Sequence, residues 1–338
     1  MAGKDLLLDI QDLSVQFNTD SGTVRAVNNL FLSLERGKAV GFVGETGAGK
    51  TTTALAILQL IQSPPGEITG GKILFNGQDI MTMTEAEKRH VRGGEIAMIF
   101  QDPMTSLNPI MSVEDQIAEM VTLHTDLKGE AAIARAHEML QLVGIRPERG
   151  PDYPHQFSGG MRQRVGIAIA LACQPLLLIA DEPTTALDVT IQAQVIELIK
   201  DLQQKVKTSM LLITHDLGIV AETCDDVAIM YAGKLVEYGT LEKIYANPLH
   251  PYTRGLFKAI PEIDGEVGGK LAVIPGLPPD LIDLPQGCSF SPRCEFATDL
   301  CREKACGMKE IEPGHNVDCY MPWLSGESPA PKTEENAL

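Results

Sequence analysis

The stretch Gly44-Glu45-Thr46-Gly47-Ala48-Gly49-Lys50-Thr51 decides the fold of this chain. Its spacing, G-x-x-x-x-G-K-[ST], is that of a backbone loop that wraps around nucleotide phosphates. Residues 39–43 before it are apolar or glycine, as in a buried strand, and residues 52–58 after it carry apolar side chains at helical spacing. The sequence therefore predicts a strand, a glycine-rich turn and a helix in succession.

This unit has a specific chemistry. Glycines let the chain turn without Cβ clashes and aim successive N–H groups at one anion, and the helix N-terminus adds the positive end of its dipole. We expect Lys50 to reach the β- and γ-phosphates and the Thr51 hydroxyl to bind Mg²⁺. The predicted nucleotide-binding residues here are Gly44, Glu45, Thr46, Gly47, Ala48, Gly49, Lys50, Thr51 and Thr52.

Length and charge limit the class of protein. A chain of 338 residues can bury a substantial core, as two domains or as one large domain with an appendage. With 28 Lys and Arg against 45 Asp and Glu, the net charge is −17, which argues against a general nucleic-acid binder. No signal peptide and no run of roughly 18 to 20 apolar residues is present, so we expect a cytosolic protein that meets a membrane only through a partner.

Two acids follow an apolar strand predicted over residues 176–180. Because a fully buried strand tolerates charge only where it ends, Asp181 and Glu182 should lie at its carboxyl end. Asp181 suits a Mg²⁺ ligand, and Glu182 suits a general base that polarises the attacking water. The alternative, two solvated acids in a turn, fits poorly beside a phosphate loop.

Other polar residues end neighbouring predicted strands. Gln101 follows the strand 96–100, where ligands are usually contacted in open α/β sheets, and it is a candidate ligand of nucleotide and Mg²⁺. His215 follows the strand 210–214 and could hydrogen-bond the γ-phosphate. Phe17, in a hairpin predicted over residues 6–34, is either a platform for adenine or a core aromatic residue.

A second anion-binding helix start is predicted at Ser158-Gly159-Gly160, ahead of a helix over residues 165–173. The simpler alternative is an ordinary serine N-cap followed by flexible glycines. Residues 112–145 are rich in helix formers, so this part of the chain should be a helical insertion.

Five of the seven cysteines lie between Cys288 and Cys319. In a reducing compartment such crowding favours metal ligation over disulfides, and four thiolates suit zinc or an iron–sulfur cluster in principle. The composition changes near Ile260 to a loop-rich segment. The tail, residues 325–338, is predicted to be disordered.

Taken together, these residues resemble the ATP-binding subunit of an ABC transporter over about residues 5–260. The shared motifs, in chain order, are the Walker A loop (44–51), the Q-loop (Gln101), the signature (157–161), the Walker B strand (177–182), the D-loop (186–188) and the switch histidine (His215). The resemblance implies an α/β fold: a RecA-like P-loop ATPase core with an antiparallel β subdomain and a helical subdomain at about 102–172.

The same resemblance implies a head-to-tail dimer that closes on two ATP molecules. Ser158, Gly159 and Gly160 of one subunit would cover the γ-phosphate held by Lys50 of the other, and Asp188 would join the nucleotide site. Phe157 and Met161 depart from the commoner L-S-G-G-Q signature, while its phosphate-facing part is intact.

A narrower resemblance, to dipeptide and oligopeptide importer ATPases, extends into the C-terminal part. It rests on residues 106–109, 153–156, 250–254, 274–279, 287–294, 301 and 315–319. It implies a C-terminal module at 261–324 in which Cys288, Cys294, Cys301 and Cys319 bind a [4Fe–4S] cluster, with zinc as the alternative. Cys306 departs from that pattern.

The resemblance implies an ATPase that powers peptide import from the cytoplasmic face of the cell membrane. Lys50, Glu182 and His215 would be its catalytic residues. Its partners would be two permease subunits, a second ATPase subunit (a heterodimer is favoured over a homodimer) and, indirectly, an extracytoplasmic solute-binding protein. The segment near residues 101–119 would receive a coupling helix from the permease. Alternatives are import of nickel or another solute, an ABC ATPase of DNA repair or translation, and a redox-regulated switch.

Overall fold

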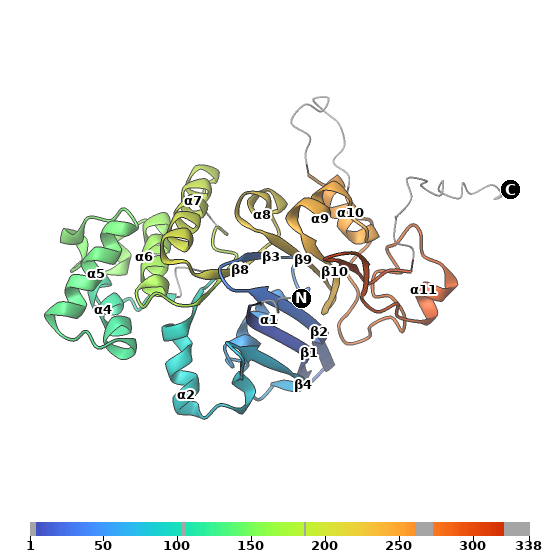
Figure 1. Cartoon of the computed structure of the whole chain (residues 1–338), viewed down its shortest axis with the longest axis horizontal. Coiled ribbons are helices and arrows are strands. Elements are labelled where there is room, and N and C mark those ends of the chain that lie inside the picture. Colours follow the sequence, from blue (N-terminus) through green and yellow to red (C-terminus); the bar gives the residue numbers. More distant parts are fainter. Residues whose placement is uncertain (1–4, 103–105, 186, 261–272, 321–338) are drawn as a thin grey trace.

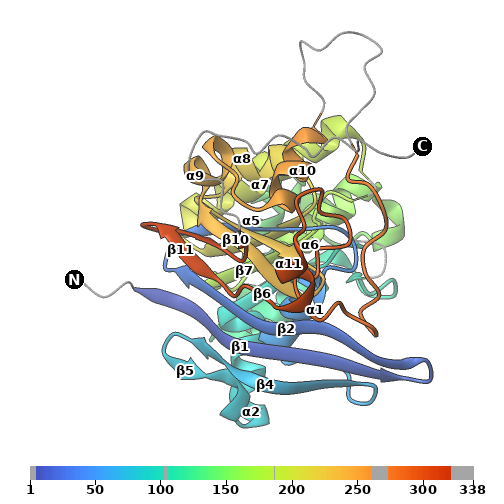
Figure 2. The same cartoon turned by 90° about the vertical axis from the view of Figure 1, so that its right-hand side faces the viewer.

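The computed structural model describes residues 5–102, 106–185, 187–260 and 273–320. Two β-sheets lie at the centre, and helices cover one of them (Figure 1). The larger sheet has the strand order β11-β12-β10-β9-β3-β8-β7-β6, and the smaller one has the order β2-β1-β4-β5. The second view separates the two sheets clearly (Figure 2).

The larger sheet is parallel where it is most deeply buried. Strands β9, β3, β8, β7 and β6 run parallel, and every residue of β3, β7, β8 and β9 is buried, which explains their continuous apolar sequences. The strands of this sheet are β3 (Ala39–Val43), β6 (Ile96–Ile99), β7 (Leu177–Asp181), β8 (Ser209–Thr214), β9 (Asp226–Tyr231), β10 (Lys234–Thr240), β11 (Lys309–Glu312) and β12 (His315–Val317).

The smaller sheet is antiparallel and contains the predicted hairpin. Its strands are β1 (Leu6–Thr19), β2 (Gly22–Glu35), β4 (Gly66–Phe75) and β5 (Gln78–Asp79). Apolar side chains of β1 and β2 pack with Phe42 of β3 and Ile57 of the first helix in one buried cluster. This packing fixes the smaller sheet beneath the glycine-rich turn.

The helices follow the predicted pattern with shifted boundaries. The region 112–145 divides into two helices, of which the first ends at His124 and the second begins after its N-cap Gly129, with a φ of 54°. The helices are α1 (Lys50–Ile57), α2 (Glu85–His90), α4 (Val113–His124), α5 (Glu130–Leu142), α6 (Gly159–Leu171), α7 (Val189–Val206), α8 (Leu217–Thr223), α9 (Leu241–Ala246), α10 (Pro251–Lys258) and α11 (Asp299–Glu303).

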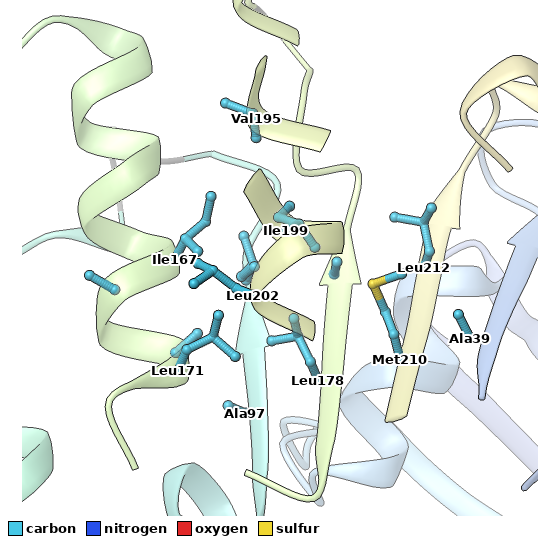
Figure 3. Close-up of a cluster of buried hydrophobic side chains, with 14 of the residues drawn as sticks. Ala39, Ala97, Ile167, Leu171, Leu178, Val195, Ile199, Leu202, Met210 and Leu212 are labelled. Atoms are coloured by element: carbon cyan, nitrogen blue, oxygen red, sulfur yellow. The ribbon is translucent and has the colours of Figure 1, made fainter. Parts of the chain in front are cut away.

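Helices α4, α5 and α6 form a group to one side of the larger sheet (Figure 1). The group is joined to the sheet by a buried cluster in which Ile167 and Leu171 of α6 face Leu178 of β7, with Ile199 and Leu202 of α7 beside them (Figure 3). Because Leu171 and Leu178 are almost completely buried, the helical group and the sheet share one core.

The C-terminal segment 273–320 is mostly irregular, as its composition predicts, but it is tied into the larger sheet. Strand β12 pairs with β10 and β11 pairs with β12, so the last described part of the chain forms one edge of that sheet. The sequence patterns did not predict these two strands. Among the described helices, none is both long and apolar enough to cross a lipid bilayer.

Candidate active site

The glycine-rich turn lies between β3 and α1, as predicted. Gly44 and Gly49 are the positions where a side chain does not fit: a Cβ atom would lie 2.2 Å from the Met230 carbonyl oxygen at Gly44 and 2.3 Å from the Ala26 carbonyl oxygen at Gly49. Gly49 also has a φ of 105°, in the region that favours glycine. The turn is therefore built for a close approach of backbones.

Lys50 is buried at the start of α1, with 5% of its surface exposed. Its Nζ atom donates to the carbonyl oxygens of Gly44 at 2.6 Å and Glu45 at 3.0 Å. Burial lowers the pKa of this ammonium group, partly offset by the charges of Glu182, Asp181 and Glu45. Lys50 thus offers a desolvated cation to an anion in the turn.

Asp181 ends β7 beside the start of α1. Its carboxylate hydrogen-bonds the Thr51 side chain, and burial raises its pKa. Among the described residues its Oδ1 atom is buried without a hydrogen-bond partner. An exposed hydroxyl beside a buried, partly unsatisfied carboxylate oxygen fits the ligands that Mg²⁺ takes beside a nucleotide.

Glu182 is the point where the predicted polar groups meet. Gln101 Nε2 donates to its Oε2 atom at 3.0 Å, and His215 Nδ1 lies 3.5 Å from its Oε1 atom. The Thr185 hydroxyl also donates to Oε2, at 2.9 Å. The backbone of Glu182 has a φ of 43°, so the turn itself holds this residue in a strained conformation.

Thr185 was not singled out in the sequence. It lies three residues after Glu182 in the same turn, so the short spacing was the available signal. Gln101 and His215 are exposed, whereas Glu182 is 14% exposed. The structure therefore brings the three strand-end residues Gln101, Glu182 and His215 together, in reach of solvent.

A cavity of ≈ 320 Å³ runs along the outer side of the glycine-rich turn. Val24 of β2 lines it, and Phe17, its cross-strand partner, points to the same face of the sheet. Phe17 is half-buried against the core, so both predicted roles, adenine platform and core aromatic residue, remain compatible with its position. The lining residues are Val24, Glu45, Thr46, Gly47, Ala48, Tyr231, Ala232, Pro278, Pro279, Asp280 and Leu281.

The second predicted phosphate site lies at the start of α6, in the helical group apart from α1 (Figure 1). Ser158 is an N-cap whose Oγ atom accepts from the Met161 N–H at 3.4 Å. Gly159 is exposed, and a Cβ atom at Gly160 would lie 2.8 Å from Ile191 of α7. The structure does not bring these three residues to Lys50 within one chain.

The unusual ends of this turn have a packing role. Phe157 is 3% exposed beneath the Arg149 guanidinium, which lies 4.3 Å from its ring centroid. Arg149 Nη1 also lies 3.6 Å from Met161 Sδ. Asp188 is the exposed N-cap position of α7; Ala186, two residues before it, lies outside the described residues.

All seven cysteines are described, and none of them forms a disulfide. Cys288, Cys294, Cys301, Cys306 and Cys319 line a single cavity of ≈ 20 Å³. Burial, with smaller effects from neighbouring groups, raises the pKa of the Cys288 thiol to about 11. Within the described ranges, however, no group of three or more His, Cys, Asp or Glu side chains is arranged to hold a metal ion.

Two family models match this chain. The model described as "ABC transporter" matches residues 27–185, which include the glycine-rich turn and Glu182. The model described as "Oligopeptide/dipeptide transporter, C-terminal region" matches residues 236–301.

Curated relatives match nearly the whole chain. It is 50% identical to the oligopeptide transport ATP-binding protein OppD of Bacillus subtilis, over 93% of this chain and 88% of that protein. It is 48% identical to the dipeptide transport ATP-binding protein DppD of Escherichia coli, over 94% and 97%. The solved post-hydrolysis dimer of the ATP-binding cassette MJ0796, bound to ADP and Pi, superposes with a TM-score of 0.63 at 24% identity, over 69% of this chain and 98% of that one.

Proposed function

Because this chain belongs to the oligopeptide and dipeptide transport ATP-binding proteins of the ABC transporter family, we propose that it hydrolyses ATP to power peptide import. The observation that carries this proposal is the convergence of Gln101, Thr185 and His215 on Glu182, next to the Lys50 and Asp181 positions. We infer that the terminal phosphate and its attacking water meet at these groups.

Each residue has a separate part in the reaction. The backbone of residues 44–52 cradles the phosphates of ATP, and Lys50 exchanges its two carbonyl partners for phosphate oxygens. Glu182 polarises the attacking water, while Gln101 and His215 orient the Glu182 carboxylate. Thr51, Asp181 and Gln101 would hold Mg²⁺, and the ion would supply positive charge to neutralise the phosphates.

The reaction needs two chains. Ser158, Gly159 and Gly160 of one subunit cover the nucleotide held by the other, with Asp188 at the same boundary. This is supported by the position of α6, which lies apart from α1 within one chain. The second subunit is a related ATPase or another copy of this chain.

The assembly we propose is peripheral to the cytoplasmic face of the membrane. Residues 1–260 bind ATP, with a helical part at about 102–172. The segment 101–119, of which residues 103–105 lie outside the described residues, receives a coupling helix from the permease. An extracytoplasmic solute-binding protein delivers the cargo to them. Reconstitution with the permease, comparing labelled peptide with nickel, identifies the cargo, and uptake of nickel alone would exclude peptide.

The substitution Glu182→Gln tests the chemistry. It keeps the size and one acceptor of Glu182 but removes the base, so turnover should fall by about 10²- to 10³-fold while ATP still binds. Glu197→Gln, on the exposed face of α7, is the matched control and should keep full turnover. If Glu182→Gln retained turnover, Glu182 would not be the base.

We further propose that Cys288, Cys294, Cys301 and Cys319, in the module 261–324, hold a [4Fe–4S] cluster, with zinc as the alternative. The support is that these thiols and Cys306 line one cavity, and that four thiolates are the ligands such a cluster takes. Bound there, it would cross-link the irregular segment and, as a cluster, accept single electrons. Iron, sulfide and zinc analysis of anaerobically purified protein tests this: zinc without iron would exclude the cluster.

A further inference from the structure

Arg293 of the C-terminal segment forms an ion pair with Glu45 of the glycine-rich turn. Its Nη1 and Nη2 atoms donate to Oε2 and Oε1 of Glu45 at 2.8 and 3.1 Å, across 248 residues of sequence. The Arg293 side chain is 5% exposed and that of Glu45 is 27% exposed. A paired, largely desolvated bidentate contact of this kind is much stronger than an ordinary surface salt bridge.

The guanidinium is held in place from its other sides. Nε donates to the Pro275 carbonyl oxygen at 3.0 Å, Nη2 to the Ile274 carbonyl oxygen at 3.3 Å, and Nη1 to the Tyr231 hydroxyl at 3.3 Å. The rings of Tyr231 and Phe290 lie 5.8 and 5.9 Å from its Cζ atom. Arg293 is therefore preorganised to meet the Glu45 carboxylate.

Glu45 passes this restraint to Lys50. Its backbone N–H donates to the Tyr252 hydroxyl oxygen at 2.9 Å, and its carbonyl oxygen accepts from Lys50 Nζ at 3.0 Å. One residue thus connects Arg293 with the cation that receives the phosphates. A shift of the Glu45 carboxylate would move the carbonyl oxygen that holds Lys50.

Arg293 also belongs to the turn that carries two of the five crowded cysteines. This turn runs from Cys288 to Cys294; Ser291 N–H donates to the Cys288 carbonyl oxygen at 2.9 Å, and Arg293 N–H donates to that of Phe290 at 3.0 Å. Phe290 lines the thiol cavity and packs on Tyr231, with ring centroids 5.2 Å apart. A continuous set of contacts therefore joins the thiol cavity to the glycine-rich turn.

We propose that Arg293 is a positioning residue for ATP binding, and that the cysteine turn 288–294 sets nucleotide affinity through the Arg293–Glu45 contact. This inference rests on the proposed ATPase function. The charge of Arg293 does not touch the nucleotide; it fixes the shape of the loop that does. Disturbance of the turn 288–294 consequently weakens ATP binding.

A double-mutant cycle on the full chain tests the first part, with Arg293→Gln, Glu45→Gln and the double variant. Each single change should raise the Kd for a fluorescent ATP analogue by about tenfold, and the double variant should be no weaker than the single ones, because both remove one contact. The rate of ATP hydrolysis at saturating ATP should change much less than KM. Arg293→Lys, which keeps charge but lacks the fork, should restore binding only in part.

Arg302→Gln is the matched control, since Arg302 is in the same segment and its side chain is 58% exposed beside Asp299. It should leave the Kd unchanged. Hydrogen exchange of the nucleotide-free protein separates positioning from stability: Arg293→Gln should speed exchange over residues 44–50. Faster hydrogen exchange confined to residues 287–320 would overturn the proposal, and so would additive effects of the two substitutions on the Kd.

Cys288→Ser tests the second part, because it disturbs the turn without touching Arg293. It should raise the Kd in the native background and have no further effect beside Arg293→Gln. An equal effect in both backgrounds would overturn the link. If the native chain did not hydrolyse ATP, the proposed function would be wrong. If the native chain hydrolysed ATP but Arg293→Gln left its Kd unchanged, only the present inference would be wrong.

Discussion

Two groups of buried charges in this molecule are satisfied in opposite ways. At the carboxyl ends of β3, β7 and β8, Lys50 rests on backbone carbonyl oxygens and Asp181 has a buried oxygen without a partner. Within β10, Glu237 is fully buried but accepts from the Leu249 N–H, the His250 N–H and His315 Nε2, at 2.7, 2.8 and 2.8 Å. The first group is incomplete without a ligand, and the second is complete within the protein.

The difference separates binding from stability. An unsatisfied buried charge costs folding free energy, and this cost is recovered when a ligand binds. In a satisfied group, removal of any one member destabilises the fold. Substitutions at the strand ends should therefore change nucleotide chemistry with little loss of stability. Substitutions in the β10 cluster, defined as Glu237, His250 and His315, should do the reverse.

Lys50→Met gives the largest expected effect. Methionine fills the space of the lysine stem but lacks its charge, so turnover should fall by about 10²- to 10³-fold. Without nucleotide, the free energy of unfolding should change by less than about 1 kcal/mol, because an incompletely paired buried charge is removed with it. Urea unfolding without and with ATP measures the free energy of unfolding and its increase by ATP, and this increase should disappear in the variant.

Lys72→Met, on an exposed position of β4, is the matched control and should keep both turnover and ATP stabilisation. A large loss of stability in nucleotide-free Lys50→Met would mean that Lys50 supports the fold, and the contrast between the two groups would fail.

Glu237→Gln should act in the opposite direction. Glutamine offers one acceptor oxygen to three buried donors and turns an NH₂ group toward another, so the free energy of unfolding should fall by about 4 kcal/mol. The turnover of protein that remains folded should change little. Urea unfolding and hydrogen exchange over residues 309–317 measure the effect, and unchanged protection of β12 would show that Glu237 does not hold this edge.

Much of the active site could be predicted because its residues are defined by short spacings and by strand ends. The turn 44–51 and the pair Asp181 and Glu182 are local patterns, and parallel strands bring their carboxyl ends to one edge. Even Thr185 was within reach, three residues from Glu182. The helix starts at α1 and α6, where the two phosphate sites are predicted, could also be located, although one chain does not join them.

The C-terminal contacts could not be predicted in this way. Arg293 meets Glu45 across 248 residues, and β12 pairs with β10 through the burial of His315 against Glu237, for which no local pattern exists. Phe157 and Met161, which depart from the commoner signature sequence, both contact Arg149, and no local pattern indicates these contacts. In each case tertiary packing, not local propensity, selected the residue.

The pH dependence of stability gives the smallest and most selective test of the β10 cluster. Burial lowers the pKa of His250 to about 4, partly offset by Glu237. Because the unfolded histidine, with a pKa near 6.5, binds a proton that the folded one refuses, stability is full above about pH 6.5 and falls as the pH drops toward 4, by about 3 kcal/mol. His250→Asn keeps an N-cap acceptor for Tyr252 N–H and should remove this loss.

His315 contributes with the opposite sign, so the comparison of variants is essential. Burial alone would lower its pKa, but the hydrogen bond to Glu237 and then that to Glu312 raise it, so its stabilisation is present at low pH and is lost as the pH rises through the raised value. Subtracting the unfolding free energy of His250→Asn from that of the native protein cancels the contribution of His315, which both proteins contain. Urea unfolding from pH 4 to 7 should give a difference that grows toward acid. A difference independent of pH would mean that His250 is protonated in the fold and that the β10 cluster is not satisfied as its contacts indicate.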